Sequence, residues 1–236
     1  MIPKVIHYCW FGGKPLPRDA RKCIDSWKRH CPDYKIVRWD ESNFDVGCHP
    51  FCKAAYEAKA WAFVSDYARL KIIYDNGGNY FDTDVEVLRN LDDLLNCNCY
   101  FGIEQVVLLC NTGLGFGAKK GNRVVGDMLD LYDTIAFDQN RTKEIACPYL
   151  NNEVLVQHGY QHIDSVVDIN GIRVYPPRYF DPIAPSRSSE NLLCDETFSI
   201  HRYSNSWGTS RQKMRRKIIG LLGLERIARI KEMLHG

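Results

Sequence analysis

The sequence lacks any long apolar run. No stretch approaches the roughly 18 uninterrupted apolar residues that a membrane-spanning helix needs. The first residues, Met1 to Lys4, lead straight into a strand-like segment without the apolar core of an export signal. We therefore expect a protein that starts and stays in the cytosol. With 236 residues, the chain can form one sizeable domain or two small ones.

The ten cysteines lack the spacing of a zinc site. Cys97 and Cys99 are separated by one residue, and Cys48 and Cys52 by three, whereas zinc sites in small modules use paired C-x2-C segments. Disulfides are also unexpected without an export signal, because cytosolic thiols stay reduced. We predict that most of these cysteines are small apolar core residues.

Signatures of phosphate-binding loops and of nucleic-acid binding are missing as well. The glycine-rich segment 111–117 has neither a Lys-Ser/Thr pair nor the G-x-G-x-x-G spacing that cradles phosphates. The first 210 residues hold 23 basic and 27 acidic side chains, a net charge of −4. This acidic body argues against a nucleic-acid partner.

Strand and helix patterns alternate along the chain. The predicted strands are 4–10, 34–39, 80–88, 100–104, 106–110, 172–175 and 198–203, and the predicted helices are 18–30, 50–59, 62–76, 121–137 and one that begins near residue 151. The strand–helix–strand opening indicates an α/β fold with a mixed, mostly parallel sheet flanked by helices.

Two carboxylates, Asp82 and Asp84, follow Gly77-Gly78 in the segment predicted as a strand. Residues i and i+2 of a strand point to the same side, so this spacing aims both carboxylates at one point. Hard divalent cations prefer such oxygen ligands, usually together with substrate phosphates. Taken alone, the pair fits a solvated or helix-capping role equally well. Its position directly after a strand-forming run favours the metal site.

The helix before this pair carries Asp66 and Arg69 on one face. One interpretation is an i,i+3 ion pair on the helix face that stabilises the helix by roughly 0.2–0.5 kcal/mol. The other places the carboxylate on sugar hydroxyls and the guanidinium near a phosphate or a sugar oxygen. Similarly, Trp10 is either a core residue or a platform for a flat base. His201 is either a structural histidine or a metal ligand.

Three motifs in this order resemble the D-x-D sugar-transferase family: KVIHYCWFGG at 4–13, SDYAR at 65–69 and GGNYFDTD at 77–84. That family includes yeast-type initiating α-mannosyltransferases, bacterial capsule and polysaccharide glycosyltransferases and, more distantly, the clostridial glucosylating toxins. The likeness covers about the first 95 residues closely and the segment 201–207 loosely. It implies one GT-A-type nucleotide-diphospho-sugar transferase domain over residues 1–209, followed by a separate tail, 210–236.

The resemblance also implies roles for single residues, including Mn²⁺ or Mg²⁺ as the cofactor. Asp84 would hold the metal, Asp82 would be shared between metal and sugar nucleotide, and Trp10 would stack on the base. No protein nucleophile is nominated. The implied sets are, for donor binding, Trp10, Asn43, Asp66, Arg69, Tyr80, Asp82, Ser206 and Trp207; for the metal, Asp82, Asp84 and His201; and for catalysis, Asp66 and Arg69. By position alone, the candidates on the acceptor side are Glu104, Asn111, Asn152 and Glu153.

The activity implied by the family is retaining transfer of a hexose onto a glycan in bacterial surface polysaccharide synthesis. UDP-galactose or UDP-glucose is favoured as the donor over GDP-mannose. Two alternatives stay open: a non-catalytic nucleotide-sugar-binding or scaffold subunit, and a phosphoesterase that uses the carboxylates.

The last 26 residues differ in charge from the body. They hold eight basic and two acidic side chains, a net charge of +6. In the basic amphipathic helix predicted here, Arg215 and Lys217 would meet anionic headgroups while Ile218 and Leu221 face acyl chains. The competing interpretations are a helix packed on the body and a nucleic-acid-binding patch, the second of which the acidic body argues against. Membrane docking would hold the protein on the inner face of the cell membrane, beside a lipid-linked acceptor.

Overall fold

The computed structural model describes residues 1–186 and 189–204. Its elements alternate between strands and helices over most of the chain. In chain order they are β1 (Val5–Cys9), α1 (Arg18–His30), β2 (Lys35–Trp39), α2 (Pro50–Glu57), α3 (Trp61–Asn76), β3 (Gly78–Tyr80), β4 (Val85–Val87), η1 (Asp92–Leu94), β5 (Cys99–Gly102), β6 (Phe116–Ala118), α4 (Arg123–Asp133), α5 (Cys147–Gln157), β7 (Val167–Ile169), β8 (Ile172–Tyr175), η2 (Pro177–Tyr179) and β9 (Ser199–His201).

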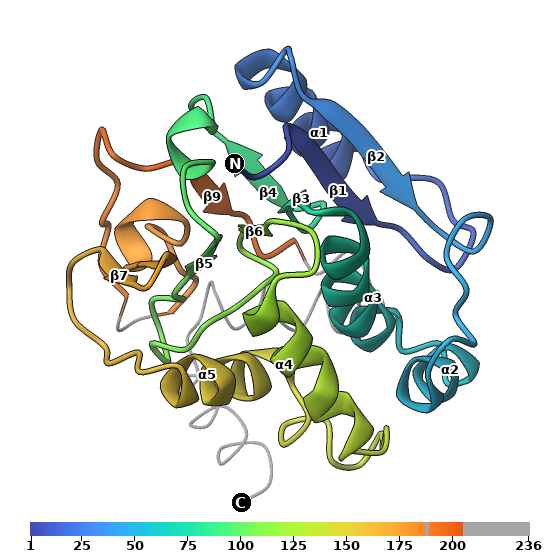
Figure 1. Cartoon of the computed structure of the whole chain (residues 1–236). Helices are drawn as coiled ribbons and strands as arrows, with labels where there is room; N and C mark the ends of the chain where they lie inside the picture. The colour runs from blue at the N-terminus through green and yellow to red at the C-terminus, as the bar shows by residue number, and fades with distance from the viewer. Residues whose placement is uncertain (187–188, 205–236) are drawn as a thin grey trace, which may run out of the picture.

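A seven-stranded sheet in the order β2-β1-β3-β6-β5-β8-β7 forms the centre of the molecule (Figure 1). Strands β1, β2, β3, β5 and β8 run in one direction, and β6 and β7 run against them. The sheet is therefore mixed and mostly parallel, as predicted. In the part of the chain that the structure describes, β4 and β9 form a second sheet, in which they pair antiparallel with Val85 opposite His201.

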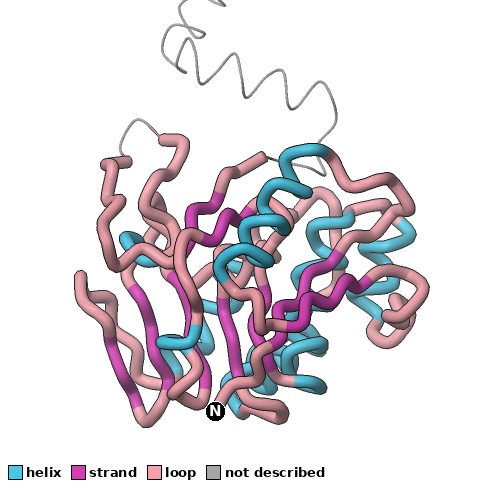
Figure 2. Tube along the Cα trace, turned by 90° about the horizontal axis from the view of Figure 1, so that it is seen from above, coloured by secondary structure: helices cyan, strands magenta, loops and turns pink. Residues whose placement is uncertain are grey.

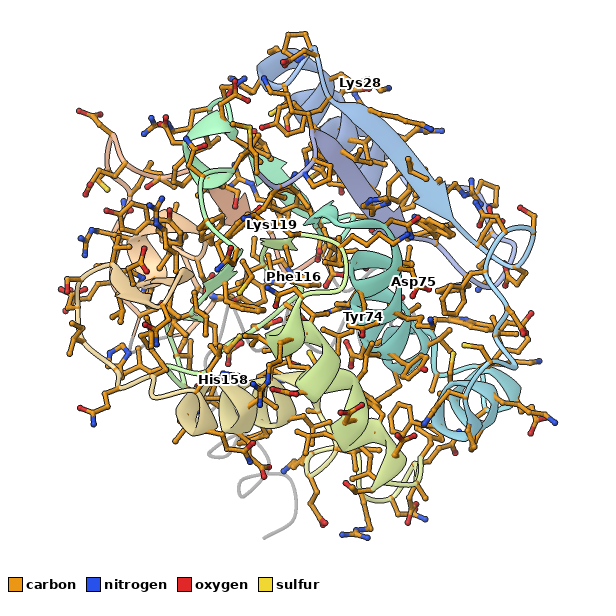
Figure 3. The ribbon with its side chains drawn as sticks, in the orientation of Figure 1. Lys28, Tyr74, Asp75, Phe116, Lys119 and His158 are labelled. Atoms are coloured by element: carbon orange, nitrogen blue, oxygen red, sulfur yellow. The ribbon has the colours of Figure 1, made fainter. Side chains whose placement is uncertain are left out.

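Each face of the large sheet carries its own hydrophobic core, because neighbouring strand residues point to opposite faces. Cys9 and Phe101 belong to the core under α2, α3, α4 and α5, whereas Tyr8 and Tyr100 belong to the core on the α1 face. Figure 1 shows α3 and α4 in front of the sheet and α1 behind it, and Figure 2 shows helical turns on both sides of the strands. Phe116 of β6, labelled in Figure 3, is fully buried and stacks on Phe101.

Helix α3 is the element that positions the site. It is buried on most of its circumference, so it lacks the polar face of a surface helix. It ends at Gly77, whose φ of +69° is one that glycine adopts readily. A Cβ on Gly77 would also lie 2.8 Å from the backbone nitrogen of Lys120. This sharp stop turns the chain into β3 and toward the two carboxylates.

Several sequence-based predictions are wrong in detail. The predicted strand 80–88 is two short strands joined by a turn, in which the backbone N–H of Val85 donates to the carbonyl of Asp82. Asp82 and Asp84 therefore lie in a turn between the two sheets and not on one face of a strand. The segment 106–110 is a turn closed by a bridge between Ile103 and Cys110. Its apolar residues suggested a strand, but three of them are exposed.

Other boundaries also differ from the sequence patterns. The glycine-rich segment 111–117, predicted as a loop, overlaps the start of strand β6. Strand β7 was not predicted at all. Helix α4 begins at Arg123 because Asn122 caps its first turn, and it ends at Asp133, before the predicted end at residue 137. Helix α5 begins at Cys147, four residues before the predicted start, with Pro148 in its first turn.

Eight of the ten cysteines are buried and Cys48 and Cys194 are exposed, so most of them are core residues, as predicted. Within residues 1–186 and 189–204, no helix has the length and apolarity needed to cross a bilayer. The predicted tail 210–236, Ser206 and Trp207 lie outside the described residues.

Candidate active site

Three distant parts of the chain meet at the turn that carries the paired carboxylates. Helix α3 contributes Asp66 and Arg69, the turn contributes Asp82 and Asp84, and β9 ends at His201. The β4–β9 pairing brings the last of these into place, because Val85 lies opposite His201. The structure thus gathers the residues that the sequence predicted for catalysis and for the metal.

Arg69 connects two carboxylates on the α3 side of the site. Its Nη2 lies 3.0 Å from Asp66 Oδ1 and 3.0 Å from Asp82 Oδ1. Its Nε donates to the carbonyl of Ser65, and its guanidinium carbon lies 5.1 Å from the centre of the Tyr80 ring. Only 4% of the Arg69 side chain is exposed. The predicted i,i+3 ion pair therefore forms, but it is buried, and the guanidinium orients both carboxylates.

Asp82 is held from further directions. The hydroxyl of Tyr80 donates to its Oδ1 over 3.0 Å, and its backbone N–H donates to the carbonyl of Gly113. A Cβ on Gly113 would lie 2.3 Å from Asp82 Oδ2. Only glycine therefore allows this carboxylate its observed position. The side chain of Asp82 is still 29% exposed, which leaves it open to a ligand.

Asp84 is bound by the segment that follows β9. Its Oδ1 lies 3.2 Å from His201 Nε2, and its Oδ2 accepts hydrogen bonds from the backbone N–H and the hydroxyl of Ser204. The backbone N–H of Arg202 donates to the Asp84 carbonyl. Residues 201–204 therefore surround this carboxylate, and the side chains of Asp84 and His201 are in direct contact.

The pKa values follow from burial and charge. Burial raises the pKa of Asp66 to about 6 and also raises that of Asp82, although Arg69 opposes both shifts. Burial acts to raise the pKa of Asp84, but the positive charge of His201 and the hydrogen bonds outweigh it, so this pKa lies below its usual range. Burial alone would lower the pKa of His201, yet Asp84 raises it above its ordinary value.

The donor atoms around this turn fit a divalent cation. Ligand atoms of Asp82, Asp84 and His201 lie within 4.8 Å of one another. Two carboxylate oxygens and one imidazole nitrogen suit Mn²⁺ or Mg²⁺, with room left for ligands from a substrate. Among the residues that the structure describes, this is the one such cluster.

The residues predicted for the donor base have other contacts here. Trp10 is 3% exposed within the α1-side core, and its indole N–H donates to the carbonyl of Lys14. Asn43 is exposed, and its side chain closes the turn after β2 through bonds to Arg38 and Asp40. Stacking by Trp10 and donor contact by Asn43 stay predictions.

The predicted acceptor-side residues divide into two groups. Glu104 accepts a hydrogen bond from Asn111, and Asn111 in turn accepts one from the N–H of Gly113. This pair therefore reaches the loop beside Asp82. Asn152 accepts from the N–H of Cys110, whereas Glu153 is exposed on α5 and bonded to Gln157. The acceptor role of all four stays a prediction.

Sequence reasoning missed several residues of the site. Gly113, Cys147, Asn151 and Asp181 carry no motif, and only the fold brings them near it. Cys147 Sγ lies 3.7 Å from Arg69 Nη1, and the Asn151 amide donates to the hydroxyl of Thr112. Asn151 precedes the predicted Asn152, and on a helix neighbouring residues face different directions. A correct start for α5 would have identified Asn151 as the buried member.

Comparison with known proteins agrees with this geometry. Residues 17–101 match the family described as the glycosyltransferase sugar-binding region containing the DXD motif. An uncharacterized glycosyltransferase of Acanthamoeba polyphaga mimivirus is 30% identical over 110 residues, which make up 43% of this chain and 43% of that protein. Inositol phosphoceramide mannosyltransferase 3 of Schizosaccharomyces pombe is 32% identical over 123 residues, 49% of this chain and 33% of that protein. The chain therefore spans less than half the length of either relative.

A solved structure supports the fold. The PaToxG glycosyltransferase superimposes with a TM-score of 0.53 at 20% identity, over 66% of this chain and 69% of that one. The fold is the GT-A type of glycosyltransferases, as predicted. The match of residues 17–101 to the glycosyltransferase sugar-binding region with a DXD motif confirms the resemblance seen in the sequence for that part of the chain.

Proposed function

We propose that this protein is a metal-dependent glycosyltransferase that moves a hexose from a nucleotide-diphospho-sugar to a glycan acceptor. The observation that carries the proposal is the convergence of Asp82, Asp84 and His201 beside the buried Asp66–Arg69 pair. A phosphoesterase needs no such pair next to its metal. The family match of residues 17–101 supports the same activity.

The residues of the site would have separate roles in metal binding and in positioning the donor. Asp84 and His201, with Asp82, would hold Mn²⁺ or Mg²⁺, and the bound ion would neutralise the diphosphate that departs. Arg69 fixes the direction of Asp66 and Asp82, so both carboxylates face the donor without having to reorganise. No protein nucleophile is assigned. Retention of configuration is part of the proposal and rests on the family resemblance.

The donor and acceptor are proposed by class. UDP-galactose, UDP-glucose and GDP-mannose are the donors to test, and the mannosyltransferase name of the fission yeast relative adds weight to the last. That relative is named for a phosphoceramide acceptor, which supports a lipid-linked acceptor for this chain. A role in bacterial surface polysaccharide synthesis, with the protein peripheral on the cytoplasmic side of the membrane, rests on the sequence alone.

The experiment that tests the activity uses the full chain with a panel of nucleotide sugars, with Mn²⁺, with Mg²⁺ and with excess chelator. We expect donor hydrolysis or transfer that needs the metal and that is lost in Asp84→Asn. The exposed Asp130 of α4 provides a matched control, since Asp130→Asn makes the same change at a residue that has no part in the site. Full activity in chelator would contradict the role of the metal. Donor binding without turnover would instead favour the non-catalytic alternative.

A further inference from the structure

We propose that Asp181 is the hydrogen-bond partner of the His201 Nδ1–H group, directly or through one water molecule, and thereby holds the ring for metal binding through Nε2. The inference rests on the metal site of the proposed function. It concerns a carboxylate that no motif marks and that follows η2, far in sequence from the paired aspartates. Asp181 is fully buried, so it is a positioning residue and touches no substrate.

Two complementary polar atoms near the metal site have no partner in the described part of the chain. They are His201 Nδ1 and Asp181 Oδ1, and both are buried. Buried polar groups are nearly always hydrogen-bonded, so we expect each of these two atoms to have a hydrogen-bond partner. When Nε2 ligates a metal ion, or when the ring is doubly protonated and Nε2–H donates to Asp84, Nδ1 carries a proton and is a donor. A carboxylate oxygen is an acceptor. The two unpartnered atoms thus match in chemistry.

Tyr203 brings the two side chains together. Its hydroxyl donates to Asp181 Oδ2 over 2.7 Å, while its ring centre lies 4.1 Å from that of His201. Tyr203 has a φ of +49°, which is uncommon for a residue other than glycine and is tolerated where the surroundings impose it. The backbone N–H of Gln105 donates to the same Oδ2 over 2.8 Å. One oxygen of Asp181 is therefore fully used, and the other is left for His201.

The charges support the same pairing. Burial raises the pKa of Asp181, and the positive charge of His201 opposes that shift. In return, Asp181 is among the carboxylates that raise the pKa of His201, after Asp84 and Asp82. A histidine that ligates a metal commonly donates its other N–H to a carboxylate, which fixes the ring and its tautomer. Asp82 and Asp84 are needed on the metal side, so Asp181 is the carboxylate for Nδ1.

Asp181→Asn tests the inference without a large change in shape. The Asn oxygen is required by Tyr203 and Gln105, so its NH₂ group would face Nδ1–H, a contact between two donors. We expect Mn²⁺ affinity of the full chain, measured by electron paramagnetic resonance of free Mn²⁺, to fall about 10–100-fold. Asp130→Asn should bind Mn²⁺ as the wild type does. Tyr203→Phe, which removes one bond to Asp181, should give an intermediate loss.

A second readout needs no metal and no activity. In ¹⁵N-histidine-labelled protein at a pH at which the His201 ring is doubly protonated, we expect a protected His201 Hδ1 signal that Asp181→Asn removes and Asp130→Asn leaves unchanged. Equal Mn²⁺ affinity and an unchanged Hδ1 signal in Asp181→Asn would overturn the inference and leave the proposed transfer intact. A wild type that neither binds Mn²⁺ nor transfers sugar would overturn the proposed function. The Hδ1 signal would still decide the contact between Asp181 and His201.

Discussion

Arg69 holds Asp66 and Asp82 with a single nitrogen, Nη2, which lies 3.0 Å from an oxygen of each. One buried cation thus faces two carboxylates, and the three charges depend on one another. Removing one member of such a buried group leaves the others uncompensated, which costs more than the group contributes when intact. This relationship links the stability of the fold to the arrangement of the site.

Replacing Arg69 by glutamine should destabilise the protein and abolish transfer. Loss of the buried cation should lower the free energy of unfolding by about 3–5 kcal/mol. Urea unfolding at pH 7 measures this value. Arg123, whose side chain is 88% exposed, provides the control, and Arg123→Gln should shift stability by no more than about 0.5 kcal/mol. Equal effects of the two substitutions would contradict the role of Arg69.

Gly113→Ala should impair activity more than stability. The new methyl group would meet Asp82 Oδ2 at 2.3 Å, so the carboxylate must move from its bonds to Arg69 and Tyr80. We expect transfer to fall at least tenfold, and the free energy of unfolding by about 1–3 kcal/mol. Gly47→Ala is the control, because its Cβ would only touch the side chain of Asp45. Wild-type kcat/KM in Gly113→Ala would refute the requirement for glycine.

Because His7 is buried, we expect the folded protein to lose stability in weak acid. Its Nδ1 accepts from the indole N–H of Trp39, and its Nε2 bonds the carbonyl of Gly77, so the buried ring is neutral. Burial lowers the pKa of His7 from 6.5 to about 4. The unfolded chain therefore binds a proton first as the pH falls. This contribution is complete above pH 6.5, is lost between 6.5 and 4, and amounts to about 3 kcal/mol at most.

The measurement is the free energy of unfolding from pH 8 to pH 4 in the wild type and in His7→Gln. The variant lacks the titrating group, so its stability should vary less over this range. His30→Gln, at the end of α1, is the control and should keep the wild-type slope. A wild-type slope in His7→Gln as well would assign the acid sensitivity to other groups.

Membrane docking through the C-terminal segment is tested by reversing charges in the full chain. Arg215→Glu, Arg216→Glu and Lys217→Glu together should remove about 3 kcal/mol of attraction to anionic lipid, roughly a hundredfold in partitioning. Vesicles that contain phosphatidylserine, sedimented with the protein, provide the assay. The control reverses three exposed charges of α1, Arg21, Lys22 and Lys28. If both triple variants bound like the wild type, docking through this segment would be ruled out.

The sequence predicted those parts of the fold in which local pattern and burial agree. Helix α1 is found at the predicted residues 18–30, because its apolar residues repeat at helical spacing and Cys31-Pro32 ends it. The segment 106–110 was mispredicted because apolar residues there are exposed on a turn, a case that no local pattern distinguishes from a strand. The three-residue strands β6 and β7 are too short to produce alternation.

The sequence predicted the site residues that belong to recognisable motifs, but not those outside the motifs. Asp66, Arg69, Asp82 and Asp84 were found because they lie close in sequence and resemble a family pattern. The reason given for the two turn carboxylates, one face of a strand, was wrong, and their convergence instead depends on a turn and on His201. Asp181 was missed since its role depends on contacts between segments that are distant in sequence, which one sequence does not reveal.

The pairing of β4 with β9 has a consequence for biosynthesis. A ribosome makes the chain from the N-terminus, so Arg69 and both turn aspartates exist more than one hundred residues before His201 leaves the exit tunnel. Until β9 emerges, β4 has no partner strand and Asp84 has neither His201 nor Ser204 beside it. The cluster of Asp82, Asp84 and His201 is thus complete only after β9 emerges, and a chain terminated before β9 would lack the proposed cation site.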